Sequence, residues 1–314
     1  MYDTIHLKLT SADADGSAVD FMGEVPCYLD EVAEHNFGGR EVISGNLGNL
    51  KVTITPFQVK VMNSLPKWYY GDNFSILSRS DTEKAIEKLS DALHLPMKEA
   101  VVTRLDVAQN LVMHSPAIEY FNALGELKGY TRVPMVEVGT LYYNRPDAQL
   151  YFYDKNREAK AHREQIPDLY QGRNVVRFEL RCKRRLGRIF NVAEVKASML
   201  YAEDFYMSVC KMWRDSFLKI AKVNKASINF QAMTTKQDLY KMAVLVMVKE
   251  CGGEVAFLSE LNQARERGQL SAKQAYDLRQ AVKGACALKA GLTIPNEAAI
   301  ELEKKVREAV RFYR

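Results

Sequence analysis

Ionisable side chains recur at every second position in three segments of this 314-residue sequence. Arg104 and Asp106 alternate with apolar residues in the segment 101–107, and similar alternation marks 149–155 and 175–182. Residues two apart share one face of a β-strand, so each segment is expected to present one polar and one apolar face. The predicted polar sets are Arg104 and Asp106; Tyr151, Tyr153 and Lys155; and Arg177, Glu179 and Arg181.

These residue types could do phosphoryl-transfer chemistry. Two carboxylates on neighbouring strands, Asp106 and Glu179, can hold a divalent cation that prefers oxygen ligands, such as Mg²⁺ or Mn²⁺. Tyrosines and cationic side chains beside them suit covalent phosphoryl transfer on a nucleic acid. A half-buried sheet produces the same alternation without any chemistry, so a purely structural role is also compatible with the pattern.

Basic residues are concentrated near the third segment. Residues 151–190 hold eleven Lys and Arg against five Asp and Glu, whereas the whole chain has a net charge of +5. A local surplus of this kind is typical of a phosphate-binding surface. We expect salt-sensitive phosphate contact from Arg181, Lys183, Arg184, Arg185 and Arg188, although the run also fits a solvated loop.

Composition narrows the class of protein. A chain with 47% hydrophobic and 26% charged residues is predicted to be globular rather than disordered or fibrous. No apolar run approaches the roughly 20 residues of a membrane-spanning helix, and the N-terminus lacks the basic start of a secretory signal. The five scattered cysteines form no CxxC pair, which argues against a disulfide framework and a zinc site. We therefore expect a cytoplasmic protein that has no membrane partner.

The elements that must position these residues fall into two predicted domains. Short β-rich runs dominate residues 1–194, together with helices predicted over 81–93 and 116–127. The pattern from 195 to 314 is helical almost throughout. The predicted fold is α+β: an antiparallel-sheet catalytic domain with flanking helices, followed by an all-helical C-terminal domain for DNA binding, partner contact or scaffolding.

The three segments also carry a family resemblance. Val102-Thr-Arg-Leu-Asp-Val, Gln149-Leu-Tyr-Phe-Tyr-Asp-Lys and Val175-Val-Arg-Phe-Glu-Leu-Arg-Cys-Lys-Arg-Arg occur in the order seen in filamentous-phage replication initiators. This gene II and gene X type of phage and plasmid protein starts rolling-circle replication. Leu50-Lys-Val-Thr-Ile-Thr-Pro and Tyr69-Tyr-Gly-Asp-Asn-Phe extend the resemblance, which covers roughly residues 1–220.

The resemblance implies an origin-specific DNA nicking-closing endonuclease with a tyrosine nucleophile. Tyr153 matches the nucleophile, which would leave a 5′-phosphotyrosyl link and a free 3′-OH for a host polymerase. Lys155 could lower the tyrosine pKa or bind the phosphate. Tyr151 could be a second nucleophile for the closing step or a stacking platform, and plain aromatic packing in the sheet fits both it and the pair at 142–143.

The resemblance also implies metal dependence, with Mg²⁺ or Mn²⁺ as cofactor. Asp106 and Glu179 match the family's acidic positions, and Arg104 and Arg177 would orient these carboxylates or stabilise transition-state charge. The five histidines never stand two apart, so the His-hydrophobe-His motif of many rolling-circle initiators is missing. The predicted metal site is therefore mainly carboxylate, or absent.

DNA is the predicted partner, as a replication origin in single-stranded or supercoiled duplex form, with host helicase and polymerase as further partners. The alternative from another class is a non-catalytic DNA-binding replication or regulatory protein with the same fold. A tyrosine recombinase fits less well, because no His-x-x-Arg precedes a tyrosine in the terminal region.

Overall fold

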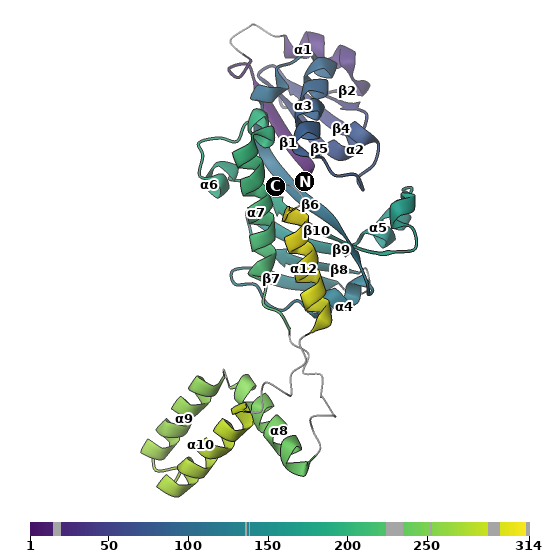
Figure 1. Cartoon of the computed structure of the whole chain (residues 1–314). Coiled ribbons are helices and arrows are strands. Elements are labelled where there is room, and N and C mark those ends of the chain that lie inside the picture. The colour runs from purple at the N-terminus through teal and green to yellow at the C-terminus, as the bar shows by residue number, and fades with distance from the viewer. Residues whose placement is uncertain are drawn as a thin grey trace. The chain divides into compact units, whose positions relative to one another are not determined.

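The computed structural model describes residues 1–14, 20–135, 137, 139–223, 235–251, 253–287 and 296–311. The chain forms two compact units (Figure 1). Unit 1 comprises residues 1–222 and 298–314, and unit 2 comprises residues 223–297. Within the described ranges, no helix is both long and apolar enough to cross a membrane.

Unit 1 is built on one ten-stranded sheet with the strand order β2-β3-β4-β5-β1-β6-β10-β9-β8-β7. Every pairing between neighbouring strands is antiparallel. This confirms the predicted antiparallel sheet. The strands are β1 (Tyr2–Thr10), β2 (Asp30–Phe37), β3 (Arg40–Leu47), β4 (Leu50–Thr55), β5 (Gln58–Ser64), β6 (Val101–Met113), β7 (Thr131–Met135), β8 (Thr140–Asn144), β9 (Ala148–Asp154) and β10 (Asn174–Cys182).

Helices flank this sheet, as predicted (Figure 1). They are α1 (Phe21–Glu24), α2 (Leu65–Tyr70), α3 (Arg79–Leu93), α4 (Ala117–Asn122), α5 (Lys155–Ala161), α6 (Leu186–Phe190), α7 (Glu203–Leu218) and α12 (Glu297–Arg311). Helix α3 begins two residues before the predicted start, because the Ser78 side chain caps it by accepting a hydrogen bond from the Asp81 amide. Helix α4 is shorter than the predicted 116–127.

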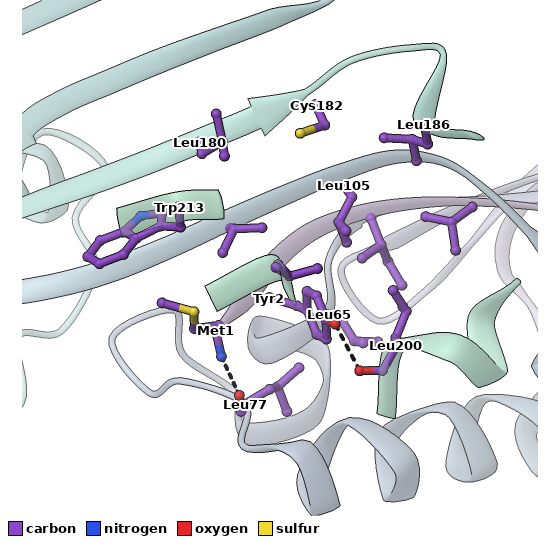
Figure 2. Packing of buried hydrophobic residues seen from close by; sticks show 14 of the residues in the cluster. Met1, Tyr2, Leu65, Leu77, Leu105, Leu180, Cys182, Leu186, Leu200 and Trp213 are labelled. Carbon is purple, nitrogen blue, oxygen red and sulfur yellow. Dashed lines mark hydrogen bonds between the residues drawn. The ribbon is translucent and has the colours of Figure 1, made fainter. Parts of the chain in front are cut away.

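The core lies between one face of the sheet and the helices α3, α7 and α12. Phe152 and Phe178 of neighbouring strands stack with ring centroids 4.4 Å apart, and Trp213 of α7 lies 4.8 Å from Phe178. Figure 2 shows the part of this core around Trp213, where the Tyr2 hydroxyl donates a hydrogen bond of 2.8 Å to the Leu200 carbonyl and the Met1 nitrogen donates to the Leu77 carbonyl. The apolar faces predicted for β9 and β10 are the faces that enter this core.

In β6, the predicted alternation fails at one point. His6 pairs with Arg104, but the next residue, Leu7, pairs with Val102, so Thr103 is an extra residue in the strand. Such a bulge reverses the order of faces. Val102 therefore faces the core and Thr103 is exposed, the opposite of the prediction, whereas the polar face beyond the bulge is as predicted.

Unit 2 contains three described helices, α8 (Lys236–Glu250), α9 (Glu254–Glu266) and α10 (Ala272–Ala287). The predicted helical C-terminal region is thus confirmed, but the units do not divide at the predicted 194/195 boundary. Helices α7 and α12 belong to unit 1 because their apolar faces cover the sheet. The Trp213 indole donates to the Phe178 carbonyl at 3.2 Å, and Leu302, Val306 and Val310 are buried in the unit 1 core.

Candidate functional site

Strands β6, β10 and β9 bring the predicted polar residues together on the face opposite the core. Arg181 pairs with Asp106 across β10 and β6. Glu179 pairs with Tyr151 across β10 and β9, and Arg177 pairs with Tyr153. Paired residues of an antiparallel sheet lie on the same face with neighbouring side chains. The sheet register therefore builds one polar cluster from three separate segments.

Glu179 is the centre of this cluster and is only 2% exposed. Its Oε1 accepts hydrogen bonds from the Tyr153 hydroxyl at 2.7 Å and from Arg177 Nε at 2.9 Å, while its Oε2 faces Arg181 Nη2 at 2.6 Å. Burial would raise the pKa of this carboxyl, but the guanidinium groups of Arg181 and Arg177 outweigh burial and hold the pKa below its usual value. Glu179 is therefore a charged, fully partnered acid.

Asp106 forms a second buried ion pair beside the first. Arg104 contacts both of its oxygens, with Nε 3.0 Å from Oδ1 and Nη2 2.6 Å from Oδ2. Arg181 Nε lies 3.9 Å from Oδ2 and so stands between the two carboxylates. Burial raises the pKa of Asp106 to about 6 even though Arg104 and Arg181 lower it.

Arg177 connects the cluster to three other parts of unit 1. Its Nη2 lies 2.9 Å from Asp3 Oδ2, and its Nη1 donates to the Asn73 carbonyl at 2.8 Å and to Asn110 Oδ1 at 3.0 Å. Asp3 in turn accepts a hydrogen bond from the Ser64 hydroxyl. Sequence reasoning missed Asp3, because the register shift in β1 between Tyr2 and Ile5 that places it here depends on pairing with β6.

The tyrosines differ in their access to solvent. Tyr153 is 6% exposed, and burial raises the pKa of its hydroxyl well above the usual value. Tyr151 is half-buried, with Arg181 4.1 Å above its ring and the Tyr142 ring stacked 4.5 Å away. Tyr142 thus belongs to the polar cluster. Its neighbour Tyr143 packs in the core and donates a hydrogen bond to the Gly125 carbonyl at 2.7 Å.

Lys155 is not part of the strand that holds Tyr153, contrary to the prediction. Strand β9 ends at Asp154, whose side chain accepts a hydrogen bond from the Arg157 amide and caps α5, so Lys155 is the first residue of that helix. Its buried ammonium lies 2.6 Å from Glu158 Oε2 and 4.7 Å from the centre of the Phe74 ring. Burial lowers the pKa of Lys155.

The donor set does not fit the expected Mg²⁺ or Mn²⁺ site. Among the residues that the structure describes, no group of three or more His, Cys, Asp and Glu side chains could hold a metal ion. Asp106 and Glu179 are close, but guanidinium groups already contact both oxygens of each carboxylate. The arginines thus place positive charge beside both carboxylates.

The predicted basic run separates into two places. Arg181 belongs to the polar cluster. Burial lowers the pKa of the nearby Lys183, and the charges of Arg181 and Arg104 lower it further. The remaining residues line a cavity of about 490 Å³, which is formed by Arg145, Pro146, Asp147, Arg184, Arg185, Arg188 and Ile189. Arg184 Nε donates to the Pro146 carbonyl at 2.9 Å, and this bond ties the run to the β8–β9 turn.

One face of this broad antiparallel sheet gathers tyrosines, arginines and carboxylates. All of these residues lie in the part of the chain that matches a known protein family. The chain belongs to the Phage_CRI family, whose model describes the N-terminal part of a phage replication-associated protein and matches residues 1–205. The resemblance to filamentous-phage gene II-type replication initiators is thereby confirmed. No individually curated protein matches the chain.

Proposed function

We propose that this protein starts DNA replication by cutting, and later rejoining, one strand of an origin through a covalent bond to tyrosine. The observation that carries the proposal is the contact between the Tyr153 hydroxyl and Glu179 inside a cluster of three arginines. A phenol beside a carboxylate has a proton acceptor, and guanidinium groups stabilise phosphate charge. Membership of a phage replication family supports the same activity.

In the proposed reaction, the phenol oxygen attacks the scissile phosphorus and the 3′ oxygen of the neighbouring nucleotide leaves. The Tyr153 proton passes to Glu179 Oε1, and a 5′-phosphotyrosyl bond forms as the P–O3′ bond breaks. The departing O3′ takes a proton from solvent water and becomes the free 3′-OH. Rejoining is the reverse, with a 3′-OH attacking the phosphotyrosine. Between the two steps, the free 3′-OH would serve as the primer for a host polymerase. A host helicase would separate the strands ahead of that polymerase. Because both partners belong to the host cell, we propose that the protein acts in the cytoplasm.

Access to the scissile phosphate favours Tyr151, rather than Tyr153, as the nucleophile. Tyr153 is almost fully buried, so its attack requires movement of the residues that cover it. Tyr151 is half-buried and lies under Arg181, where a phosphate could reach it without such movement. Proton acceptance therefore favours Tyr153 and access favours Tyr151, and the two must be distinguished by substitution.

Single Tyr153→Phe and Tyr151→Phe variants provide that test. Each variant is incubated with supercoiled plasmid carrying the replicon's origin, with Mg²⁺, Mn²⁺ or a chelator, and analysed for nicking and for a protein–DNA adduct that survives detergent. Adduct loss in one variant alone identifies the nucleophile. Tyr143→Phe is the matched control, because its hydroxyl lies on the core side of the sheet.

Two observations favour a second function. Guanidinium groups already contact both oxygens of each carboxylate, and Tyr153 is buried. Under this alternative, the protein binds origin DNA without cutting it. It predicts salt-sensitive binding with no adduct in the unsubstituted protein under any metal condition. Adduct formation that persists in the Tyr151→Phe/Tyr153→Phe double variant would instead show that nicking is real but that the proposed tyrosines are wrong.

A further inference from the structure

The polar cluster continues into an open face of the sheet. On the side opposite the core, β4, β5 and β1 are covered by none of the described helices, since α1, α2 and α3 contact the core side. Residues on this open side alternate with buried ones, as in the pair Val59 and Lys60. The open face therefore consists of side chains whose neighbours can be identified from the strand register.

The register places cationic side chains in a row across four strands. Lys51 of β4 pairs with Met62 of β5, Met62 pairs with His6 of β1, and His6 pairs with Arg104 of β6. Lys60 and Lys8 pair with each other one position along the same face. We call this set the cationic row: Lys51, Lys60, Lys8, Arg104 and, beyond Arg104, Lys183. His6 lies among them as a neutral imidazole, because burial and the charge of Arg104 lower its pKa.

Little negative charge balances the cationic row. Strands β4 and β5 contain no Asp or Glu, and Lys51 and Lys60 are exposed and form no ion pair with any residue that the structure describes. Arg104 is balanced by Asp106. Asp13, at the Lys8 end, accepts hydrogen bonds from Thr10 and is close enough to Lys8 for their charges to attract. Lys51 and Lys60, like charges held near each other without an ion pair among the described residues, indicate a surface that binds an anionic ligand.

We propose that the cationic row binds the sugar-phosphate backbone of a single DNA strand that continues from the tyrosine site. The inference rests on the proposed function, since it assigns the strand's path beyond the cut. At about 4.8 Å per strand spacing, the row from Lys51 to Lys183 spans roughly 19 Å, enough for several nucleotides. Its inner members are partly buried, with the Arg104 side chain 28% exposed, so a thin, flexible strand reaches them better than a stiff duplex.

The test is the salt dependence of binding by a Lys51→Gln/Lys60→Gln variant of the full chain. Fluorescence anisotropy with a labelled single strand of about 12 nucleotides, from about 50 to 200 mM salt, gives the slope of log K against log salt. Each lost phosphate contact should reduce the slope by about 0.7, so we expect a decrease of about 1.4 and weaker binding at low salt. An unchanged slope would overturn the proposal.

Lys84→Gln/Lys98→Gln is the matched control. It removes the same charge from exposed lysines of α3 and of the short helix Met97–Glu99, outside the open face, and should leave the slope unchanged. An equal decrease in this control would show that net charge, not the cationic row, governs binding. A decrease for a duplex probe but none for the single strand would show that the ligand class is wrong.

This measurement is independent of nicking, because it is made without divalent metal in the Tyr151→Phe/Tyr153→Phe background. If the unsubstituted protein forms no adduct and the lysine substitutions still lower the slope, the cationic row stands and the proposed function fails. If adducts form and the slope is unchanged, the proposed function stands and the cationic row fails.

Discussion

Arg177 shows how a full charge is held inside this protein. Arg177 is 2% exposed, and its guanidinium contacts two carboxylates and two amide oxygens. It therefore neutralises Asp3 and shares the neutralisation of Glu179 with Arg181. A buried ion pair contributes little relative to a well-packed apolar group, but loss of one partner leaves an uncompensated buried charge. The cost of disrupting the cluster is therefore much larger than the net contribution of any one of its bonds.

Substitution of Arg177 should consequently be severe. Arg177→Met leaves Asp3 and Glu179 without their shared cation, and we expect the free energy of unfolding to fall by about 3–5 kcal/mol in urea denaturation. Arg145→Met is the control, since Arg145 is 40% exposed and pairs with Asp147, and it should cost less than about 1 kcal/mol. Similar losses in both variants would contradict the central place of Arg177.

The raised pKa of Asp106 predicts that the free energy of unfolding depends on pH. Burial raises its pKa in the folded protein to about 6, above the value near 3.9 of an unfolded chain, so folding favours the protonated form. Its contribution to stability is fully present below about pH 4 and is lost as the pH rises through about 6. Relative to Asp106→Asn, the unsubstituted protein should lose about 3 kcal/mol between about pH 4 and 7, measured by urea denaturation. Parallel pH profiles of the two proteins would contradict this.

At the scale of elements, a single turn covers the cluster. Gly71, with φ of 89°, ends α2 in the left-handed region that glycine tolerates best. Asp72 Oδ1 then accepts hydrogen bonds from the amides of Phe74 at 2.8 Å and Ser75 at 2.6 Å. This turn presents the Asn73 carbonyl to Arg177 and places the Phe74 ring against Lys155. A local side-chain cap thus closes the site.

Removal of this cap should loosen the turn. Asp72→Ala deletes the acceptor of both hydrogen bonds, and we expect a local destabilisation of about 1 kcal/mol. Hydrogen exchange at the Phe74 and Ser75 amides, measured by NMR, should accelerate several-fold while exchange in α3 is unchanged. Asp72→Asn retains an acceptor oxygen and should exchange almost as slowly as the unsubstituted protein. Equal protection in all three proteins would show that the cap is not what holds the turn.

Strand faces were predictable from the sequence wherever pairing is regular. The alternation in 175–182 correctly separates Arg177 and Glu179 from the core residues, because a strand's period of two is a local property. The Thr103 bulge and the end of β9 at Asp154 were not predictable, because each depends on a partner strand or a helix cap. The ion pairs that occupy both carboxylates were missed for the same reason.

At the scale of the whole molecule, unit 2 is an insertion into unit 1. The chain leaves unit 1 after α7 and returns to it in α12, and Asn296 Nδ2 donates a hydrogen bond of 3.2 Å to the Val223 carbonyl. Val223 and Asn296, near the two points where the chain passes between the units, therefore lie side by side. The change of pattern near residue 195 marked the start of the helical region, but it could not show that α7 and α12 pack on a sheet distant in sequence.

Unit 1 should fold without the insertion. A chain in which residues 224–295 are replaced by a short Gly/Ser linker should keep its strand signal in circular dichroism and melt within a few degrees of the full chain, because its core is intact. A chain that ends at residue 223 also lacks α12 and exposes the partners of Leu302, Val306 and Val310, so it should melt at a much lower temperature. Equal melting of both shortened chains would contradict the assignment of α12 to unit 1.

The position of α12 has a consequence for the order of events during synthesis. The Tyr120 hydroxyl and the His114 amide both donate hydrogen bonds to Glu301, which lies 181 and 187 residues further along the chain. A surface formed early in translation thus waits for a helix that is synthesised much later. Domains fold as they leave the ribosome, generally from the N-terminal side. Here, unit 2 is synthesised before unit 1 has all of its helices. The nascent sheet therefore keeps an apolar strip uncovered until α12 has left the ribosome.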